Sequence, residues 1–386
     1  MASFKYYVWV LLGGMLVPVL LVLCTNLYLL QQDSKPDRFM HASEWQEKTH
    51  GITMATMPGR NEGSFKILRL NDRLPDINAI VFGSSTSFAI QADMFPSGIR
   101  IYNFSQPGNP LSAIIGQIEY ILDHYENVKW MFVPLDWSVG FLFFVGEPSE
   151  TDLSRDYVQQ AIATNEQRRP WGSAIKTALS YPMVINLYST LKTILTSNNK
   201  IRRFQIAFFP PDEGEEYVCP DGIEKDYDSY ARGHCFGFRY DGSLASPPPL
   251  SNPRGIMKQI LMLRDILAAT KGQPQQNYLV RLSEQAHRLK KRGGQMIFFR
   301  PPLFPGLEAR LLEDNLRHTK AVISRWAEDN NLVVLDFGPS ENFGCLASEF
   351  ADAAHTTSPC YRKLFDATWR KYPELSRLPV ATSIEH

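Results

Sequence analysis

Five short apolar runs, each followed by a segment with helical spacing, constrain the fold of this chain most strongly. Continuous apolar runs of this length are typical of strands that are buried on both faces, and such strands occur in parallel sheets covered by helices. With right-handed crossovers, the pattern predicts a three-layer α/β/α sandwich of the flavodoxin-like kind around a mainly parallel five-stranded sheet. The predicted strands are 78–82, 99–104, 129–135, 295–299 and 332–336, and the predicted helices are 87–94, 111–125, 276–292, 307–330 and 360–372.

The rhythm of strands and helices is interrupted between residues 138 and 252. This stretch contains Pro210-Pro211, a loop rich in glycine and aspartate, and a run of three prolines from Pro247. It predicts a partly helical insertion into a single large domain at 76–386. An insertion after the third strand emerges at the carboxyl ends of the strands, where ligands bind in such sheets. Residues 33–75 are more polar and are expected to form a tether.

The N-terminus has the composition of a membrane anchor. No charged residue occurs from 6 to 32. About 20 apolar residues cross a bilayer core of ~30 Å, whereas the apolar region of a cleaved signal peptide is only ~7–15 residues long. No small-x-small cleavage site follows the run. The sequence therefore predicts an uncleaved transmembrane helix within residues 1–32, although the flanking positive charges do not decide its orientation.

The cysteines indicate where the domain folds. Cys24 lies in the predicted anchor, and the other four form two sequence-local pairs, Cys219–Cys235 and Cys345–Cys360. Disulfides in these pairs would favour an oxidising compartment such as a bacterial periplasm. The alternative is four reduced thiols, buried as small hydrophobic groups. A zinc site is less consistent with the sequence, because no Cys-x-x-Cys spacing occurs, and we expect no metal or cofactor.

The charge balance excludes one class of partner. Lys and Arg together number 40, as do Asp and Glu. Nucleic-acid binding proteins usually present a strongly basic face, so we expect no nucleic-acid partner.

Two short motifs suggest catalysis. Gly83-Ser84-Ser85 follows the first predicted strand, where glycine permits a tight turn and the backbone N–H of Ser85 would lie near the start of a helix. Asp352 and His355 follow the last strand, and their spacing of three places them on one face of a helical turn. Alone, the first motif is an ordinary helix cap and the second a surface pair. Together they predict a triad, because both loops leave the same edge of a parallel sheet.

These motifs resemble those of the SGNH/GDSL hydrolase superfamily, whose first block is Gly-Asp-Ser and whose last is Asp-x-x-His. The resemblance implies that Ser85 is the nucleophile, His355 the general base and acid, and Asp352 the carboxylate that orients it. It also implies an oxyanion hole formed by the backbone N–H groups of Ser85 and Gly108. The asparagine of the third family block is missing, since the third strand ends before Asp136. Either Asn109 replaces it or the hole uses backbone groups alone.

The Gly-Ser-Ser variant and the N-terminal anchor also resemble the membrane-anchored DltD-like proteins of teichoic-acid D-alanylation and exopolysaccharide O-acylation systems. This resemblance implies an extracytoplasmic O-acyltransferase that acts on a cell-surface polysaccharide or glycopolymer through an acyl-serine intermediate. The implied partner is a multi-spanning membrane-bound O-acyltransferase. Two alternatives stay open: a carbohydrate esterase with the same triad, and an inactive polysaccharide-binding or scaffold subunit. A water-excluding insertion would favour transfer over hydrolysis. Its lining could include four aromatic residues, although core packing is their more frequent use: Trp137, Phe141, Phe143 and Phe144.

Overall fold

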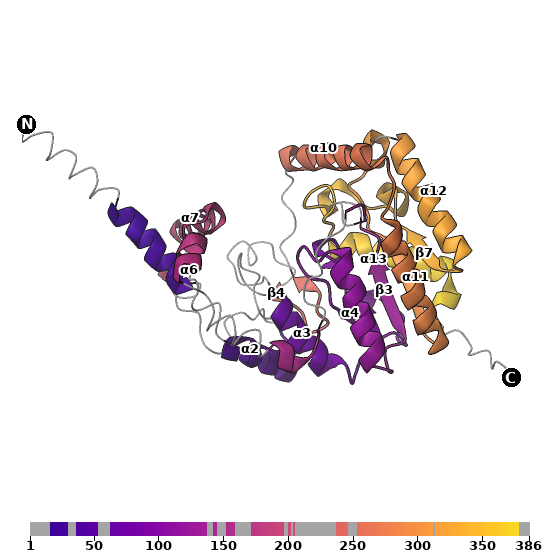
Figure 1. Ribbon diagram of the computed structural model, residues 1–386, viewed down its shortest axis with the longest axis horizontal. Coiled ribbons are helices and arrows are strands. Elements are labelled where there is room, and N and C mark those ends of the chain that lie inside the picture. The colour runs from indigo at the N-terminus through magenta and orange to yellow at the C-terminus, as the bar shows by residue number, and fades with distance from the viewer. Residues whose placement is uncertain are drawn as a thin grey trace, which may run out of the picture. The chain divides into compact units, whose positions relative to one another are not determined.

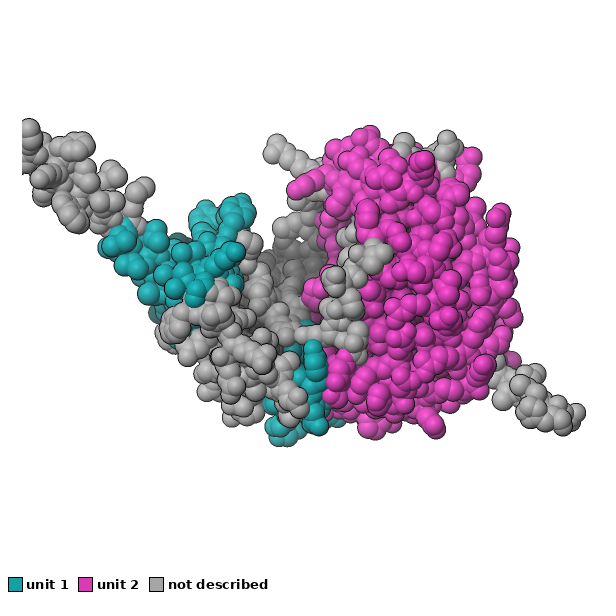
Figure 2. Space-filling model, in the orientation of Figure 1, with its two compact units in different colours: residues 1–65, 155–237 teal, residues 66–154, 238–386 magenta. Residues whose placement is uncertain are grey.

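The structure is a computed structural model that describes residues 16–29, 36–52, 62–136, 142–144, 152–158, 171–196, 200–201, 204, 237–245, 253–311 and 313–377. The chain forms two compact units, coloured separately in Figure 2. Unit 1 comprises residues 1–65 and 155–237, and unit 2 comprises residues 66–154 and 238–386. Each unit is described by itself.

Unit 2 is built on a five-stranded sheet in which every neighbouring pair is parallel. The strand order is β2-β1-β3-β6-β7, so the chain first adds a strand on one side of β1 and then continues on the other. The edge between β1 and β3 is therefore the switch point at which such sheets bind ligands. All five predicted strands are present, with bounds of Ala79–Val81 (β1), Ile101–Asn103 (β2), Trp130–Pro134 (β3), Gln295–Arg300 (β6) and Val333–Asp336 (β7).

Helices cover both faces of this sheet. On one face, α13 (Ser358–Lys371) contributes Phe365 to an aromatic cluster with Phe95 and Phe132. The ring centroid of Phe95 lies 4.9 Å from that of Phe132 and 4.9 Å from that of Phe365. The opposite face carries α4 (Leu111–His124), α11 (Gln276–Lys291) and α12 (Glu313–Asp329). On this face the ring centroids of Phe298 and Trp326 lie 5.1 Å apart. Figure 1 shows α4 and α11 side by side in front of β3. The predicted helices at 111–125, 276–292 and 360–372 are confirmed.

The structure corrects two helical predictions and adds a helix that was missed. Residues 87–94 do not form an α-helix, since only the 3₁₀ turns Ser85–Ser87 and Ala92–Met94 occur there. The helix predicted from 307 begins with a separate 3₁₀ turn, Glu308–Arg310, and α12 follows it. A long helix, α10 (Pro253–Thr270), was not predicted at all.

The expected tether at 33–75 also differs, because it contains α2 (Pro36–Thr49) and α3 (Glu62–Arg73). In unit 2, Ile67, Leu68 and Leu70 of α3 are fully buried. The neighbouring Lys66 is buried too, and its ammonium group donates to the carbonyl oxygens of Asn103, at 2.6 Å, and of Gly242. Charged residues made this segment look solvated, but backbone carbonyls satisfy the charge inside the unit.

Part of the predicted insertion at 138–252 belongs to unit 1. Its described helices are α6 (Trp171–Ala178) and α7 (Tyr181–Thr196), and a short hairpin, β4 (Gly237–Phe238) and β5 (Leu244–Ala245), closes it. The predicted pair Cys219–Cys235 lies outside the described residues.

The predicted membrane anchor is described only in part. Residues 16–29 are helical, whereas 1–15 and 30–32 lie outside the described residues. Within the described ranges, no helix combines the length and the hydropathy that crossing a membrane would require.

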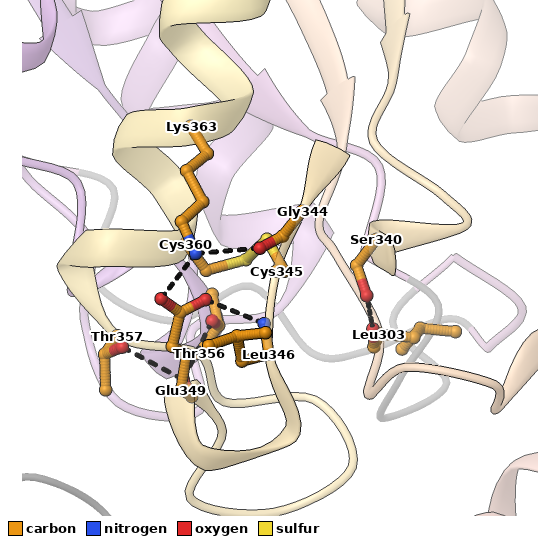
Figure 3. The surroundings of a disulfide bond; sticks show 10 residues. All are labelled: Leu303, Ser340, Gly344, Cys345, Leu346, Glu349, Thr356, Thr357, Cys360 and Lys363. Atoms are coloured by element: carbon orange, nitrogen blue, oxygen red, sulfur yellow. Dashed lines mark hydrogen bonds and ion pairs between the residues drawn. A yellow bond between two sulfur atoms is a disulfide. The ribbon is translucent and has the colours of Figure 1, made fainter. Parts of the chain in front are cut away.

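The predicted pair Cys345–Cys360 is a disulfide, with an S–S distance of 2.05 Å. Figure 3 shows that Lys363, on α13, lies beside it and donates to the carboxylate of Glu349 at 2.7 Å and to the carbonyl of Gly344 at 2.8 Å. The disulfide spans a separation of 15 residues. The closed loop carries Asp352 and His355, so two of the three predicted triad residues lie inside it.

Removing this disulfide is expected to destabilise the chain. A crosslink that closes a loop of about 15 residues lowers the conformational entropy of the unfolded chain, which stabilises the folded state by about 3 kcal/mol. We expect the double variant Cys345→Ser, Cys360→Ser to lose a similar amount of unfolding free energy, measured by urea denaturation of the full chain in detergent. Cys24→Ser, which removes an exposed free thiol, is the control. Equal unfolding midpoints for the double variant and the native chain would contradict the prediction.

Candidate active site

The structure brings the predicted serine and histidine together. Ser85 begins the 3₁₀ turn after β1, and His355 lies in the loop before α13. Their Oγ and Nε2 atoms are 2.7 Å apart, although the residues are separated by 270 positions in the chain. Ser85 is partly exposed, whereas its neighbours Ser84 and Thr86 are buried. The serine hydroxyl is thus accessible on a turn that is otherwise packed.

Asp352 completes the row of hydrogen-bonded groups. Its Oδ2 lies 2.7 Å from Nδ1 of His355, and its Oδ1 accepts from the backbone N–H groups of Ala354 and His355, each at 2.9 Å. The spacing of three was expected to place both residues on a helical turn, and this is wrong. They lie in a loop closed by an antiparallel bridge between Phe350 and Thr356, in which the carboxylate itself binds the backbone.

The two groups shift each other's pKa in opposite directions. Burial raises the pKa of Asp352, but the hydrogen bond and charge of His355 and the N–H of Ala354 outweigh it, so this pKa lies well below its usual range. Burial lowers the pKa of His355, but the hydrogen bond and charge of Asp352 outweigh it, and the charge of Asp136 adds to them. The pKa of His355 is therefore raised above its ordinary 6.5. A raised pKa makes this imidazole a better proton acceptor.

Gly83 is required by the turn that presents Ser85. Its φ is +148°, a conformation that L side chains rarely adopt. A Cβ at this position would also lie 2.5 Å from Oγ of Ser87 and 3.1 Å from Cγ of Pro134. No larger residue fits between the turn and the neighbouring strand β3.

Asp136 fixes the same turn through hydrogen bonds to its side chains. The sequence analysis did not identify it as a site residue. This buried carboxylate follows β3, and its Oδ2 accepts from the hydroxyl of Thr86 at 2.6 Å and from that of Ser84 at 2.9 Å. On the other side, the hydroxyl of Tyr361 in α13 donates to the carbonyl of Thr86 at 2.8 Å. The only signal in the sequence was an acidic residue at the end of a buried strand beside β1.

The predicted oxyanion-hole residues differ in availability. Gly108 is exposed on a turn with φ of +63°, and within the described part of the chain neither its backbone N–H nor that of Ser85 has an acceptor. Asn109 is buried, and its amide nitrogen donates to Gln117 at 3.1 Å and to the carbonyl of Gly83 at 3.5 Å. The side chain of Asn109 is thus tied to Gln117, while its 3.5 Å contact with Gly83 lies at the outer limit of a hydrogen bond. This arrangement favours backbone N–H groups over the amide of Asn109 as oxyanion donors.

Two further residues support the site and were missed from the sequence. Gln259, on the unpredicted helix α10, accepts from the N–H of Ala353 at 2.7 Å and helps to lower the pKa of Asp352. Asn103, fully buried at the end of β2, donates to the carbonyls of Ser87 and Ile90 at 2.9 and 2.8 Å. Each fixes one of the two loops that meet at the site.

Among the residues that the structure describes, one group of side chains lies close enough together to be considered as metal ligands. It consists of Cys345, Glu349 and Cys360. The two sulfur atoms are bonded to each other, and the Glu349 carboxylate accepts from Lys363 and from the N–H of Leu346. Disulfide sulfurs are not the thiolates that metal ions bind, so these residues do not form a metal centre in this state.

A hydroxyl, an imidazole and a carboxylate in this order have the geometry of nucleophilic acyl transfer. No protein-family model matches this chain. No curated protein is significantly similar to it. The interpretation of the site therefore depends on its geometry and on the two short motifs.

The titration of His355 gives a first prediction. The base must be neutral to accept the serine proton, so activity rises with pH as His355 loses its proton. Because its pKa is raised, we expect the midpoint of the acidic limb of kcat/KM above 6.5. Asp352→Asn removes the largest raising interactions, so the midpoint moves to lower pH, and kcat falls by a factor on the order of 10⁴, as in other such triads. A midpoint that does not move would contradict the assignment.

Asp136 gives a second prediction. Asp136→Asn keeps an oxygen that accepts from Ser84 and Thr86 but removes a negative charge that raises the pKa of His355. We expect the acidic limb to move to lower pH. Asp136→Ala leaves the two buried hydroxyls without their acceptor, and we expect a loss of about 1–3 kcal/mol in unfolding free energy.

The matched control is Asp93→Asn, at an exposed aspartate whose partner is Arg362 on the surface. It should change neither the pH profile of kcat/KM nor the stability appreciably. If Asp136→Asn gives the same pH profile as this control, the electrostatic role of Asp136 is wrong.

Proposed function

We propose that this chain is a serine O-acyltransferase of the SGNH type, which transfers an acyl group onto a polysaccharide or glycopolymer outside the cytoplasm. The observation that carries the proposal is the row from Ser85 Oγ through both ring nitrogens of His355 to Asp352, with both distances at 2.7 Å. The Gly-Ser-Ser and Asp-x-x-His motifs at these positions support membership of the SGNH/GDSL superfamily. The Gly-Ser-Ser variant and the predicted N-terminal anchor support the DltD-like type.

The proposed reaction has two half-reactions. In the first, Oγ of Ser85 attacks the acyl carbonyl of the donor while Nε2 of His355 takes the hydroxyl proton. The tetrahedral intermediate then collapses, and His355 returns the proton to the leaving group, which leaves an acyl-serine. In the second, a sugar hydroxyl gives its proton to His355 and attacks the acyl carbonyl. The bond from that carbon to Oγ of Ser85 then breaks, and His355 returns the proton to Oγ, which regenerates the serine. Asp352 stays ionised throughout and stabilises the imidazolium.

The oxyanion in this mechanism is bound by the backbone N–H groups of Ser85 and Gly108. The asparagine of the third family block is absent, and the amide of Asn109 is engaged elsewhere. Loss of one oxyanion donor costs on the order of 10²–10³ in rate in other enzymes. We therefore expect slow turnover with a simple ester and faster turnover with a donor that supplies its own interactions.

The choice between transfer and hydrolysis depends on the acceptor, because the triad is the same. An esterase therefore remains the second candidate. Of the aromatic residues considered as a lining, Phe143 is buried and Phe144 is 51% exposed, whereas Trp137 and Phe141 lie outside the described residues. The aligned triad favours either enzyme over an inactive scaffold. The disulfide within the site loop supports a place in an oxidising compartment. A multi-spanning membrane-bound O-acyltransferase is the partner that the resemblance to DltD-like proteins implies.

Labelling with a fluorophosphonate tests the nucleophile. We expect the native chain to be labelled and Ser85→Ala to lose the label, because the probe reacts with a serine activated by a neighbouring base. The control is Ser376→Ala, which removes a hydroxyl that donates a hydrogen bond to the carbonyl oxygen of Pro373. This variant should be labelled as strongly as the native chain. Label retained in Ser85→Ala would exclude this nucleophile, and no label in any form would favour the scaffold.

If Ser85 is labelled, an activated acetyl ester then tests transfer against hydrolysis. Mass spectrometry of the quenched protein should show an acyl adduct on the peptide that contains Ser85. A transferase loses the adduct faster when an oligosaccharide is added, with the acyl group recovered on the sugar. An esterase loses it at a rate that the sugar does not change, with free acid as the product.

A further inference from the structure

Unit 1 exposes an unusual amount of apolar surface. Most of the large hydrophobic side chains that are exposed in the described residues lie on the helix at 16–29 or between 175 and 204. Soluble proteins rarely expose contiguous apolar patches of this extent, and such patches mark sites that contact membranes or other proteins. The exposed hydrophobic side chains of these two segments are Leu16, Val17, Val19, Leu20, Leu21, Ile175, Leu179, Tyr181, Val184, Ile185, Tyr188, Leu191, Leu195, Ile201 and Phe204.

Helix α7 is apolar over about half of its circumference. Its inner face buries Leu187 and Ile194, which pack with Val22 and Leu29 of the helix at 16–29. Beside this face lies an outer stripe of exposed residues at helical spacing of three or four, composed of positions 181, 184, 185, 188, 191 and 195. In this stripe, Tyr181 is 78% and Tyr188 is 63% exposed. A surface helix of a soluble domain carries polar residues on that side, so this face is built for an apolar environment.

The helix at 16–29 and the α6–α7 segment form one structure. The side-chain amide of Asn26 donates to the carbonyl of Ala178 at 2.7 Å, and Asn26 is fully buried. An apolar cavity of about 560 Å³ lies between the two helices, and its lining includes Leu21, Tyr28, Leu191 and Phe204. The Asn26 hydrogen bond and the apolar contacts of α7 thus join α6 and α7 to the segment predicted to enter the membrane.

Charge is nearly absent from the same segment. Residues 171–196 contain only two charged residues, Lys176 and Lys192, and both side chains are exposed. Long lysine side chains place their ammonium groups at the lipid headgroups while their stems stay in apolar surroundings. An interfacial helix carries polar and basic residues beside its apolar face, as α7 does with the exposed Ser189, Lys192 and Thr196. Lipid therefore fits this surface better than a protein partner.

We propose that α6 and α7 form a second membrane contact, in which the outer stripe of α7 and the cavity beside it are covered by lipid acyl chains. With 16 residues, α7 is about 24 Å long, shorter than the ~30 Å apolar core of a bilayer. Helix α7 lies in the interface, with its apolar face among the acyl chains and the ammonium group of Lys192 among the headgroups. This inference does not depend on the chemistry at Ser85.

Photo-crosslinking of the full chain tests this proposal. The residue p-benzoylphenylalanine, which reacts with nearby C–H groups, replaces Tyr188 on the stripe or, as a control of similar exposure, Val280 on α11 in unit 2, which is 53% exposed. Both variants are irradiated in vesicles of phosphatidylethanolamine and phosphatidylglycerol and in native membranes. We expect phospholipid adducts by mass spectrometry at position 188, and none above background at position 280.

Two outcomes would overturn the proposal. Lipid adducts at position 188 that do not exceed those at 280 would show that the stripe is not covered by lipid. Adducts to a protein in native membranes, with no lipid adduct in either preparation, would make the stripe a protein-docking face. The far-ultraviolet circular dichroism and unfolding midpoint of both variants should match the native chain, so that misfolding does not explain either result.

Discussion

The hydrogen bond between Ser85 and His355 requires two loops, from opposite ends of the sequence, to be fixed to within a fraction of an ångström. The turn after β1 is fixed by the carboxylate of Asp136, which binds two hydroxyls on either side of the nucleophile. The loop before α13 is fixed by its disulfide and by Asp352, whose carboxylate binds backbone N–H groups as well as the imidazole. The order of the parallel sheet brings these loops to one edge, and the polar contacts give them their final positions.

The parts of this arrangement that follow from local pattern were predictable. Strands buried on both faces have continuous apolar runs, so all five were located from the sequence, and their parallel order placed Ser85 near His355. Cys345 and Cys360 were paired because they are close in the sequence and flank the Asp-x-x-His motif. These signals are strong because each one depends on residues that are neighbours in the chain.

The parts that depend on distant contacts were not predictable. A buried Lys66 looks like a surface residue in the sequence, because the carbonyl oxygens that satisfy it come from positions far along the chain. Gln259 could not be recognised as a support for the site, because its partners at Ala353 and Asp352 lie nearly a hundred residues away. The Asp352–His355 spacing suggested a helix, but the carboxylate's own hydrogen bonds to the backbone stabilise a turn of a different shape.

The start of α13 connects to both halves of the site through adjacent residues. Cys360 is covalently joined to the segment that leads into the Asp352–His355 loop, while the hydroxyl of the next residue, Tyr361, binds the turn that carries the nucleophile. One turn of this helix thus holds both halves of the site. A substitution that repacks the start of α13 is therefore expected to disturb the nucleophile and its base together, although neither lies on the helix.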